Sequence, residues 1–287
     1  MTLSLLTTSL LDGLLLGAVY GLVAMGLNLI WGVMNVINLA HGAVMMLGMF
    51  GAYLLFVTWS VPPYVSLPLL TLAGWLFGVL VYWVAVHRMI DAPHLSSLLA
   101  TFAVNMVIIG VGTELFTSSP RNIDYSLGSV QVAALTLQGS RIAAAGLSMA
   151  LSLSVCGLLK KTTFGKRIRA VADNRDAAEL MGIPTSRVLA STFGIGTALA
   201  IVAGVLLATV FPFNVLSGEG YQTKAFVMCV LGGLGNPMGA LLGGLLLGAV
   251  EGLIPSFLPV SAVPMIEFGL FVLILLVRPG GLFGGGR

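Results

Sequence analysis

Three polar residues, Asn35, Asn38 and His41, follow one another at a spacing of three inside an otherwise apolar stretch. If that stretch is helical, the spacing places all three side chains within one third of the helix circumference. Amide and imidazole groups in apolar surroundings need hydrogen-bond partners, so they either line an aqueous pathway or tie helices together. For His41 alone, a hydrogen bond between helices is favoured, because no neighbouring Cys, Asp or His would complete a metal site.

The chain lacks the residue patterns of an enzyme. No G-x-x-x-x-G-K-[ST] sequence occurs, and residues 157–166 do not fit that spacing, so we expect no phosphate-binding loop and no ATP hydrolysis. No nucleophile is paired with a base, and no ligand spacing for a metal is present. The sequence therefore predicts no catalytic residue, no bound metal and no cofactor.

Three carboxylates, Glu114, Glu251 and Glu267, lie near the ends of apolar runs. Side chains in such positions reach toward the interface between membrane and water, which explains them as well as a proton relay would. Both interpretations stay open at this point.

The segment 160–188 is the one densely charged stretch. It holds seven of the thirteen Lys and Arg residues, namely Lys160, Lys161, Lys166, Arg167, Arg169, Arg175 and Arg187. Loops rich in Lys and Arg face the cytoplasm, so this segment is predicted to be a cytoplasmic loop. Five apolar runs precede it, which predicts an N-terminus on the opposite side.

A short helix is predicted within this loop, from about Arg175 to Met181. Asn174 or Asp176 can cap its start, and Gly182 stops it with Pro184 beyond. A helix of two turns is marginal in water, so it must rest on something. Lipid headgroups would suffice for the basic residues, whereas small Ala177 and Ala178 beside apolar Leu180 and Met181 suit a protein groove better.

Composition places these features in a membrane protein. Hydrophobic residues make up 58% of the 287 residues and charged residues only 8%, whereas about a quarter of an ordinary soluble domain is charged. A net charge of +3, confined to loops, does not indicate nucleic-acid binding. We expect most of the surface to face lipid.

Long apolar runs without alternation predict an all-α, polytopic transmembrane bundle of about eight spans, each of about 20 residues. Short or broken helices are expected near 32–42 and 232–239, where polar residues, glycines and Pro237 interrupt the runs. Discontinuous helices often flank the central site of a transporter, so Asn236 joins Asn35, Asn38 and His41 as a pathway candidate. One domain, 1–287, is expected to hold all of these elements.

Glycines recur at a spacing of four in three places: Gly13, Gly17 and Gly21; Gly235, Gly239 and Gly243; Gly244, Gly248 and Gly252. Such ladders let helix backbones approach closely in lipid. Packing within the chain is favoured over dimerisation.

Three blocks of sequence resemble one known family. They are Asn35-Val-Ile-Asn-Leu-Ala-His-Gly42, the loop Gly165-Lys-Arg-Ile-Arg-Ala-Val-Ala-Asp-Asn174 with Ala177-Ala-Glu-Leu-Met-Gly182, and Gly232-Gly-Leu-Gly-Asn-Pro-Met-Gly239. Together they resemble the branched-chain amino-acid permeases of ATP-binding-cassette (ABC) importers, over effectively the whole chain.

The resemblance implies a bacterial inner-membrane permease subunit that carries branched-chain or related hydrophobic amino acids. It implies three kinds of protein partner: two ABC ATPase subunits, a second permease that is homologous or identical, and a periplasmic or lipid-anchored substrate-binding protein. The lipid bilayer surrounds the permease. The resemblance assigns ATPase coupling to residues of the charged loop: Gly165, Lys166, Arg167, Arg169, Ala170, Ala177, Ala178, Glu179 and Gly182. Two alternatives stay open, a urea or short-amide importer permease and a secondary transporter or channel.

Overall fold

The computed structural model describes residues 3–90, 92–132, 135–278 and 280–284, so the extreme ends of the predicted domain, 1–2 and 285–287, lie outside it. Its longer helices are α1 (Leu3–Met34), α2 (His41–Trp59), α3 (Pro63–Val81), α4 (His94–Phe116), α5 (Gly139–Lys161), α8 (Thr185–Ala208), α9 (Ser217–Gly232), α10 (Pro237–Leu253) and α11 (Val263–Val277). Two shorter helices, α6 (Thr163–Asp173) and α7 (Arg175–Leu180), follow α5. A hairpin of β1 (Ser129–Val132) and β2 (Leu135–Gln138) precedes α5.

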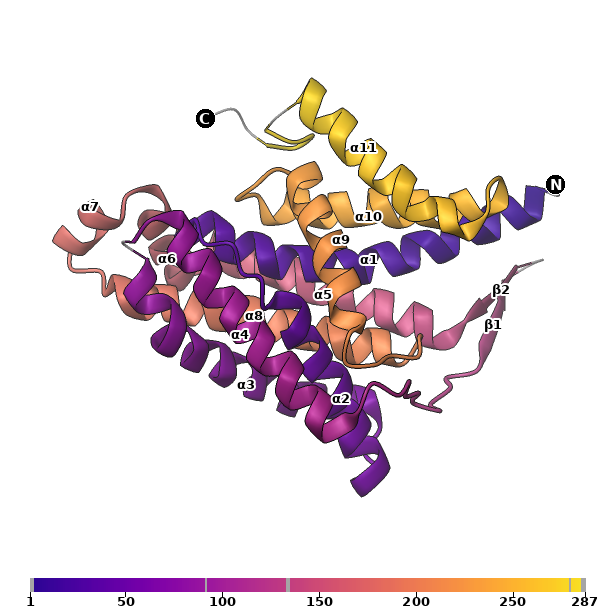
Figure 1. The fold of residues 1–287 in the computed structure, drawn as a ribbon. Coiled ribbons are helices and arrows are strands. Elements are labelled where there is room, and N and C mark those ends of the chain that lie inside the picture. Colours follow the sequence, from indigo (N-terminus) through magenta and orange to yellow (C-terminus); the bar gives the residue numbers. More distant parts are fainter. Residues whose placement is uncertain (1–2, 91, 133–134, 279, 285–287) are drawn as a thin grey trace.

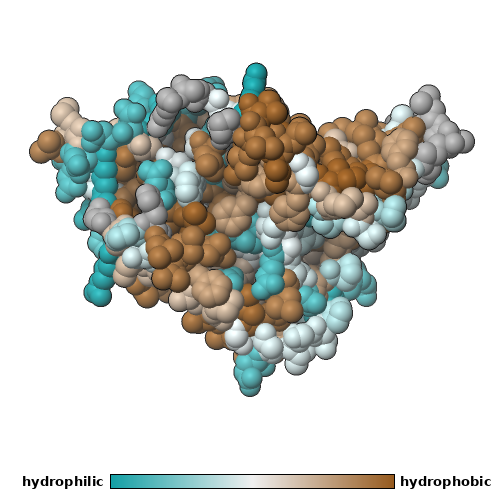
Figure 2. Space-filling view, turned by 45° about the horizontal axis from the view of Figure 1, so that its top comes forward, coloured by the Kyte–Doolittle hydropathy of each residue, from teal (hydrophilic) through white to brown (hydrophobic). Residues whose placement is uncertain are grey.

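Within the described residues, eight helices are long and apolar enough to cross a bilayer. The predicted all-α bundle of about eight spans is confirmed. α1 and α8 are mostly buried and form the centre, while α3, α4 and α11 expose rows of large apolar side chains. Hydrophobic residues cover much of the face shown in Figure 2. Such a surface is stable only when lipid solvates it, so the chain is a multi-pass membrane protein.

Close packing of α1 against α10 follows from the glycine ladders. The two helices run side by side in opposite directions (Figure 1), with Gly17 opposite Gly244 and Gly248. A Cβ atom placed on Gly17 would lie only 2.8 Å from the carbonyl oxygen of Gly244. Between helices in lipid, such backbone contact supplies the van der Waals attraction that apolar burial cannot. The predicted packing within the chain is confirmed.

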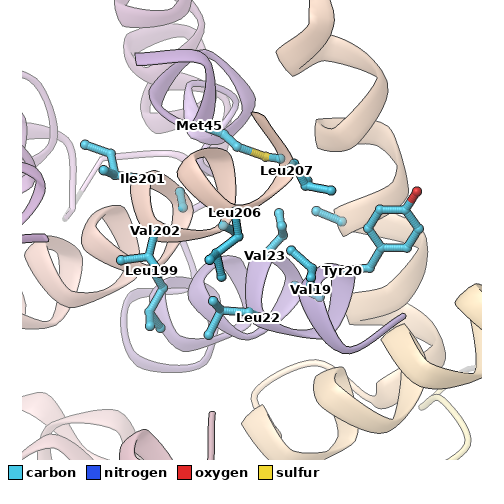
Figure 3. Packing of buried hydrophobic residues seen from close by; sticks show 14 of the residues in the cluster. Val19, Tyr20, Leu22, Val23, Met45, Leu199, Ile201, Val202, Leu206 and Leu207 are labelled. Atoms are coloured by element: carbon cyan, nitrogen blue, oxygen red, sulfur yellow. The ribbon is translucent and has the colours of Figure 1, made fainter. Parts of the chain in front are cut away.

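Apolar side chains fill the centre of the bundle where α1, α2 and α8 meet. Figure 3 shows Val23 of α1 beside Leu206 of α8, and Met45 of α2 reaching Leu207. All four side chains are buried. The middle of the bundle is therefore closed.

Two breaks interrupt the helices where they were predicted. The first spans residues 35–40, between α1 and α2, and the second spans residues 233–236, between α9 and α10. Asn35 ends α1 with a φ of 53°, in the left-handed region that an L-residue seldom adopts. Because 35–40 is not helical, the condition under which Asn35, Asn38 and His41 would share one helix face is not met.

The two ends of the bundle differ in character. α6 and α7 project at the left of Figure 1, whereas the N-terminal part of α1 and the β-hairpin lie at the right. Hydrophilic residues gather at the left in Figure 2. We call the end that carries α6 and α7 the basic end and the other the hairpin end.

Candidate functional site

α6 builds the base of the charged loop and was not predicted as a helix. The hydroxyl of Thr162 caps it by accepting a hydrogen bond of 3.0 Å from Gly165 N. Ile168 and Val171 are buried against the bundle, while Lys166 and Arg167 are exposed on the opposite side. The spacing of Gly165, Ile168 and Val171 by three is the amphipathic signal in the sequence that identifies this helix.

Close contact holds α6 to the end of α5. A Cβ atom on Gly165 would collide with the carbonyl oxygens of Leu158 and Leu159, so a larger residue would separate the two helices. The guanidinium of Arg169 also donates a hydrogen bond to the carbonyl of Leu159. Arg169 therefore links α6 to the end of α5, while its side chain is exposed.

α7 is the short helix predicted from the sequence, and the structure confirms its extent and its caps. Asn174 Oδ1 accepts a hydrogen bond of 2.9 Å from Ala177 N, and Gly182 follows the helix with a φ of 78°. Ala178 is buried against the bundle. A side-chain cap contributes about 1 kcal/mol, which matters for a helix this short.

The outward surface of α7 carries large apolar side chains, and no other described residue packs over them. Leu180 is 89% exposed and Met181 is 82% exposed. Ala177 and Glu179 lie beside them, and Glu179 accepts a hydrogen bond of 3.3 Å from the Thr185 hydroxyl. We call Ala177, Glu179, Leu180 and Met181 the α7 surface.

The predicted coupling residues thus divide into two groups. Lys166, Arg167, Ala177, Glu179 and Gly182 are exposed, so a partner can reach them. Gly165 and Ala178 are buried, Ala170 is half-buried, and Arg169 is tied to Leu159, so these residues position the two helices.

A cavity of about 570 Å³ lies directly behind α6 at the basic end. Ile168, Arg169 and Asp173 of α6 form one wall, and α1, the end of α5 and the second break form the others. Because α6 is part of its wall, a displacement of α6 changes the shape of this cavity.

The second break borders the same cavity and is fixed by two asparagines. Asn236 caps α10 by accepting a hydrogen bond of 3.1 Å from Gly239 N, and its Nδ2 donates to the carbonyl of Phe283. Asn28 of α1 donates a hydrogen bond of 3.0 Å to the carbonyl of Gly233. Asn236 and Asn28 both line the cavity. Asn28 was missed, although it is an amide inside a long apolar run.

The first break is held by hydrogen bonds and does not line this cavity. Asn38 is buried, its carbonyl accepts a bond of 3.2 Å from Gln222, and its side chain accepts one from Ala40 N. The hydroxyl of Thr101 bonds the carbonyl of Ile37 at 2.9 Å. Gln222 and Thr101 were missed, since their pairing with the break depends on contacts between distant segments.

The remaining two polar residues of the first break have different surroundings. His41 is buried, with Nε2 3.0 Å from the carbonyl oxygen of Val23 on α1, the interhelical contact favoured from the sequence. Asn35 is exposed at the end of α1. The structure thus places Asn35 at the surface and Asn38 and His41 inside.

Comparison with known proteins assigns this arrangement to a family. Residues 9–277 match the family described as the permease component of the branched-chain amino acid transport system. The high-affinity branched-chain amino acid transport system permease protein LivH of Salmonella typhimurium is 31% identical, covering 95% of this chain and 94% of LivH. BraD of Pseudomonas aeruginosa is 30% identical over 96% of this chain and 94% of its own length. The probable LivH of Methanocaldococcus jannaschii is 28% identical over 92% and 88%.

Proposed function

The chain belongs to the family of branched-chain amino acid transport permease components, and from that premise we propose that it is the membrane-spanning subunit of an ABC importer. In this proposal it provides a path through the bacterial inner membrane for branched-chain or related hydrophobic amino acids. Separate subunits hydrolyse ATP. The observation that carries the proposal is the α7 surface, where Leu180 and Met181 stand out from the bundle.

The α7 surface has the properties of a docking element. An apolar side chain kept in water costs free energy that burial in a partner's groove recovers, and helices are commonly recognised by an apolar face laid into such a groove. The cap of Asn174 and the buried Ala178 hold α7 in a fixed position. We propose that each of two ATPase subunits receives one such helix, from this chain and from a second permease subunit.

The orientation in the membrane follows from charge. Lys166 and Arg167 are exposed at the basic end, and loops with such residues stay in the cytoplasm. We therefore propose that 160–188 is the cytoplasmic coupling loop of a single permease domain, 1–287. The hairpin end then faces the substrate-binding protein.

Force from the ATPases would reach the path through α6. A push on α7 is transmitted to α6 because only Asn174 separates the two helices. α6 in turn lines the cavity at the basic end together with the second break, where Asn236 and Asn28 lie. We propose that this cavity is the inner part of the path and that movement of α6 opens or closes it.

Reconstituted transport tests this proposal. The permease, its ATPases and its binding protein are placed in proteoliposomes, and uptake of radiolabelled leucine is measured. We expect uptake that requires ATP and that persists when an uncoupler removes the proton gradient. Valine and isoleucine should compete with leucine, whereas urea and acetamide should not.

One control and two contrary outcomes complete the test. An ATPase variant that binds but does not hydrolyse ATP should stop sustained uptake. Leucine uptake that follows the proton gradient and ignores ATP would instead identify a secondary transporter, and ATP-driven uptake of urea without leucine would identify a short-amide importer.

A further inference from the structure

A second cavity, of about 600 Å³, lies at the hairpin end, opposite the α6 and α7 helices. Its walls come from the N-terminal half of α1, the end of α10, the start of α11 and single residues of α5 and α9. The volume falls within the range of small-molecule sites, about 300–1,000 Å³.

Polar side chains from four helices meet in this cavity, and three of them are charged. Lys224 of α9 bonds Glu251 of α10 at 2.6 Å and lies 3.7 Å from Glu267 of α11. Tyr20 of α1 donates a hydrogen bond of 3.3 Å to Glu251. Two of these residues, Glu251 and Glu267, are the carboxylates for which the sequence left snorkelling and a relay open. Both are paired with Lys224 inside the bundle, so snorkelling does not describe them.

A second ion pair lines the same cavity. Arg141 of α5 lies 3.2 Å from Asp12 of α1, and both residues line the cavity. The described lining therefore holds two cations, Lys224 and Arg141, against three carboxylates. The lining thus presents groups of both signs, so a ligand that carries both an ammonium and a carboxylate can pair each of its charges there.

Three groups in this lining have spare hydrogen-bonding capacity. Among the described residues, Asp12 Oδ1 and Arg141 Nε are buried atoms without a hydrogen-bond partner, and Glu267 Oε1 has only the ion pair with Lys224 at 3.7 Å, beyond hydrogen-bond distance. Glu267 is only 4% exposed, so water does not readily solvate it. Buried polar atoms are normally bonded, so these three atoms are the groups of the lining that a polar ligand would bond. Two of the three are anionic acceptors and one is a cationic donor.

We propose that this cavity is a binding site for a free amino acid with an apolar side chain, held as its zwitterion. The ammonium group donates to Glu267 and Asp12, and the carboxylate accepts from Arg141. Phe211, Leu16 and Val263 supply apolar surface for the side chain. The site rests on the proposed function, since it is the place where a binding protein at the hairpin end would release its cargo.

Binding of leucine tests the site directly. The complete permease–ATPase complex is placed in nanodiscs without binding protein, and radiolabelled leucine binding is measured. We expect saturable binding that Glu267→Gln weakens at least tenfold. Isoamylamine and 4-methylpentanoate, which each lack one charge of leucine, should compete at least tenfold less well than leucine.

Glu114→Gln is the matched control, because Glu114 is an exposed carboxylate that does not line the cavity. It should bind leucine as the unsubstituted complex does. A second measurement avoids the charged residues altogether: a cysteine in place of Leu16 should be protected from a maleimide by leucine and not by urea.

The outcomes separate the two proposals. If ATP-driven leucine uptake is intact but leucine neither binds the nanodisc complex nor protects the cysteine at position 16, the site is overturned and the importer function stands. If isoamylamine competes as well as leucine, the cavity is a cation site and the zwitterion assignment is wrong. If the complex shows no ATP-driven uptake, the proposed function itself fails.

Discussion

Replacement of Leu180 by aspartate is expected to abolish ATP-driven uptake while the permease remains folded in the membrane. Leu180 is 89% exposed, so the bundle loses no packing when it is replaced. In an interface with an ATPase the same change removes an apolar anchor and buries an unpaired charge, which costs about 2 kcal/mol or more. Affinity for the ATPase should fall by a factor of about 30 or more.

Copurification of the ATPase with the tagged permease, measured beside uptake, checks this prediction. Leu180→Met is the matched control: it keeps an apolar side chain of similar size and should retain both properties. An aspartate variant that still copurifies with its ATPase and still transports would show that the partner does not bury the α7 surface.

Replacement of Gly17 by valine is expected to prevent normal assembly of the bundle. The added Cβ would lie 2.8 Å from Gly244 O, 3.0 Å from Leu245 Cα and 3.2 Å from Gly248 Cα. Since all three are backbone atoms, no rotamer change relieves the contact, and the helices must separate. Overpacking of this kind costs about 3 kcal/mol, and we expect a fall in melting temperature of roughly 10 °C or loss of folded protein.

Thermal unfolding of the purified protein, followed by size-exclusion chromatography, measures this effect. Gly146→Val on α5 is the control, because a Cβ atom there meets nothing within 4 Å. The control should retain its melting temperature within a few degrees. Equal loss in both variants would mean that valine disturbs any helix and that the contact between α1 and α10 is unimportant.

Features that depend on residues close together in the chain could be predicted from the sequence. The spans follow from long apolar runs, and α7 follows from Asn174, Gly182 and the residues between them, which the structure confirms. The breaks near Asn35 and Asn236 follow from polar residues in apolar runs. α6 was missed because its many charges hid the spacing of its buried residues.

Features that depend on contacts between residues far apart in the chain could not be predicted. Asn28 meets Gly233 and Gln222 meets Asn38 only because α1, α9 and the breaks come together in the fold. The same holds for the cluster of Lys224, Glu251 and Glu267, whose members come from three helices. The shared helix face considered for Asn35, Asn38 and His41 required a helical segment, and the backbone of residues 35–40 is not helical, in agreement with the break predicted near 32–42.

Photo-crosslinking from α7 tests the central claim, that this helix receives force from an ATPase. Met181, 82% exposed, is replaced by p-benzoylphenylalanine in the assembled transporter, and the same residue is placed at exposed Val130 of the hairpin as a control. We predict a crosslink to the ATPase from position 181, with a yield that changes when ATP is added, and none from position 130. A complex that transports leucine but yields no ATPase crosslink from position 181 would contradict the claim.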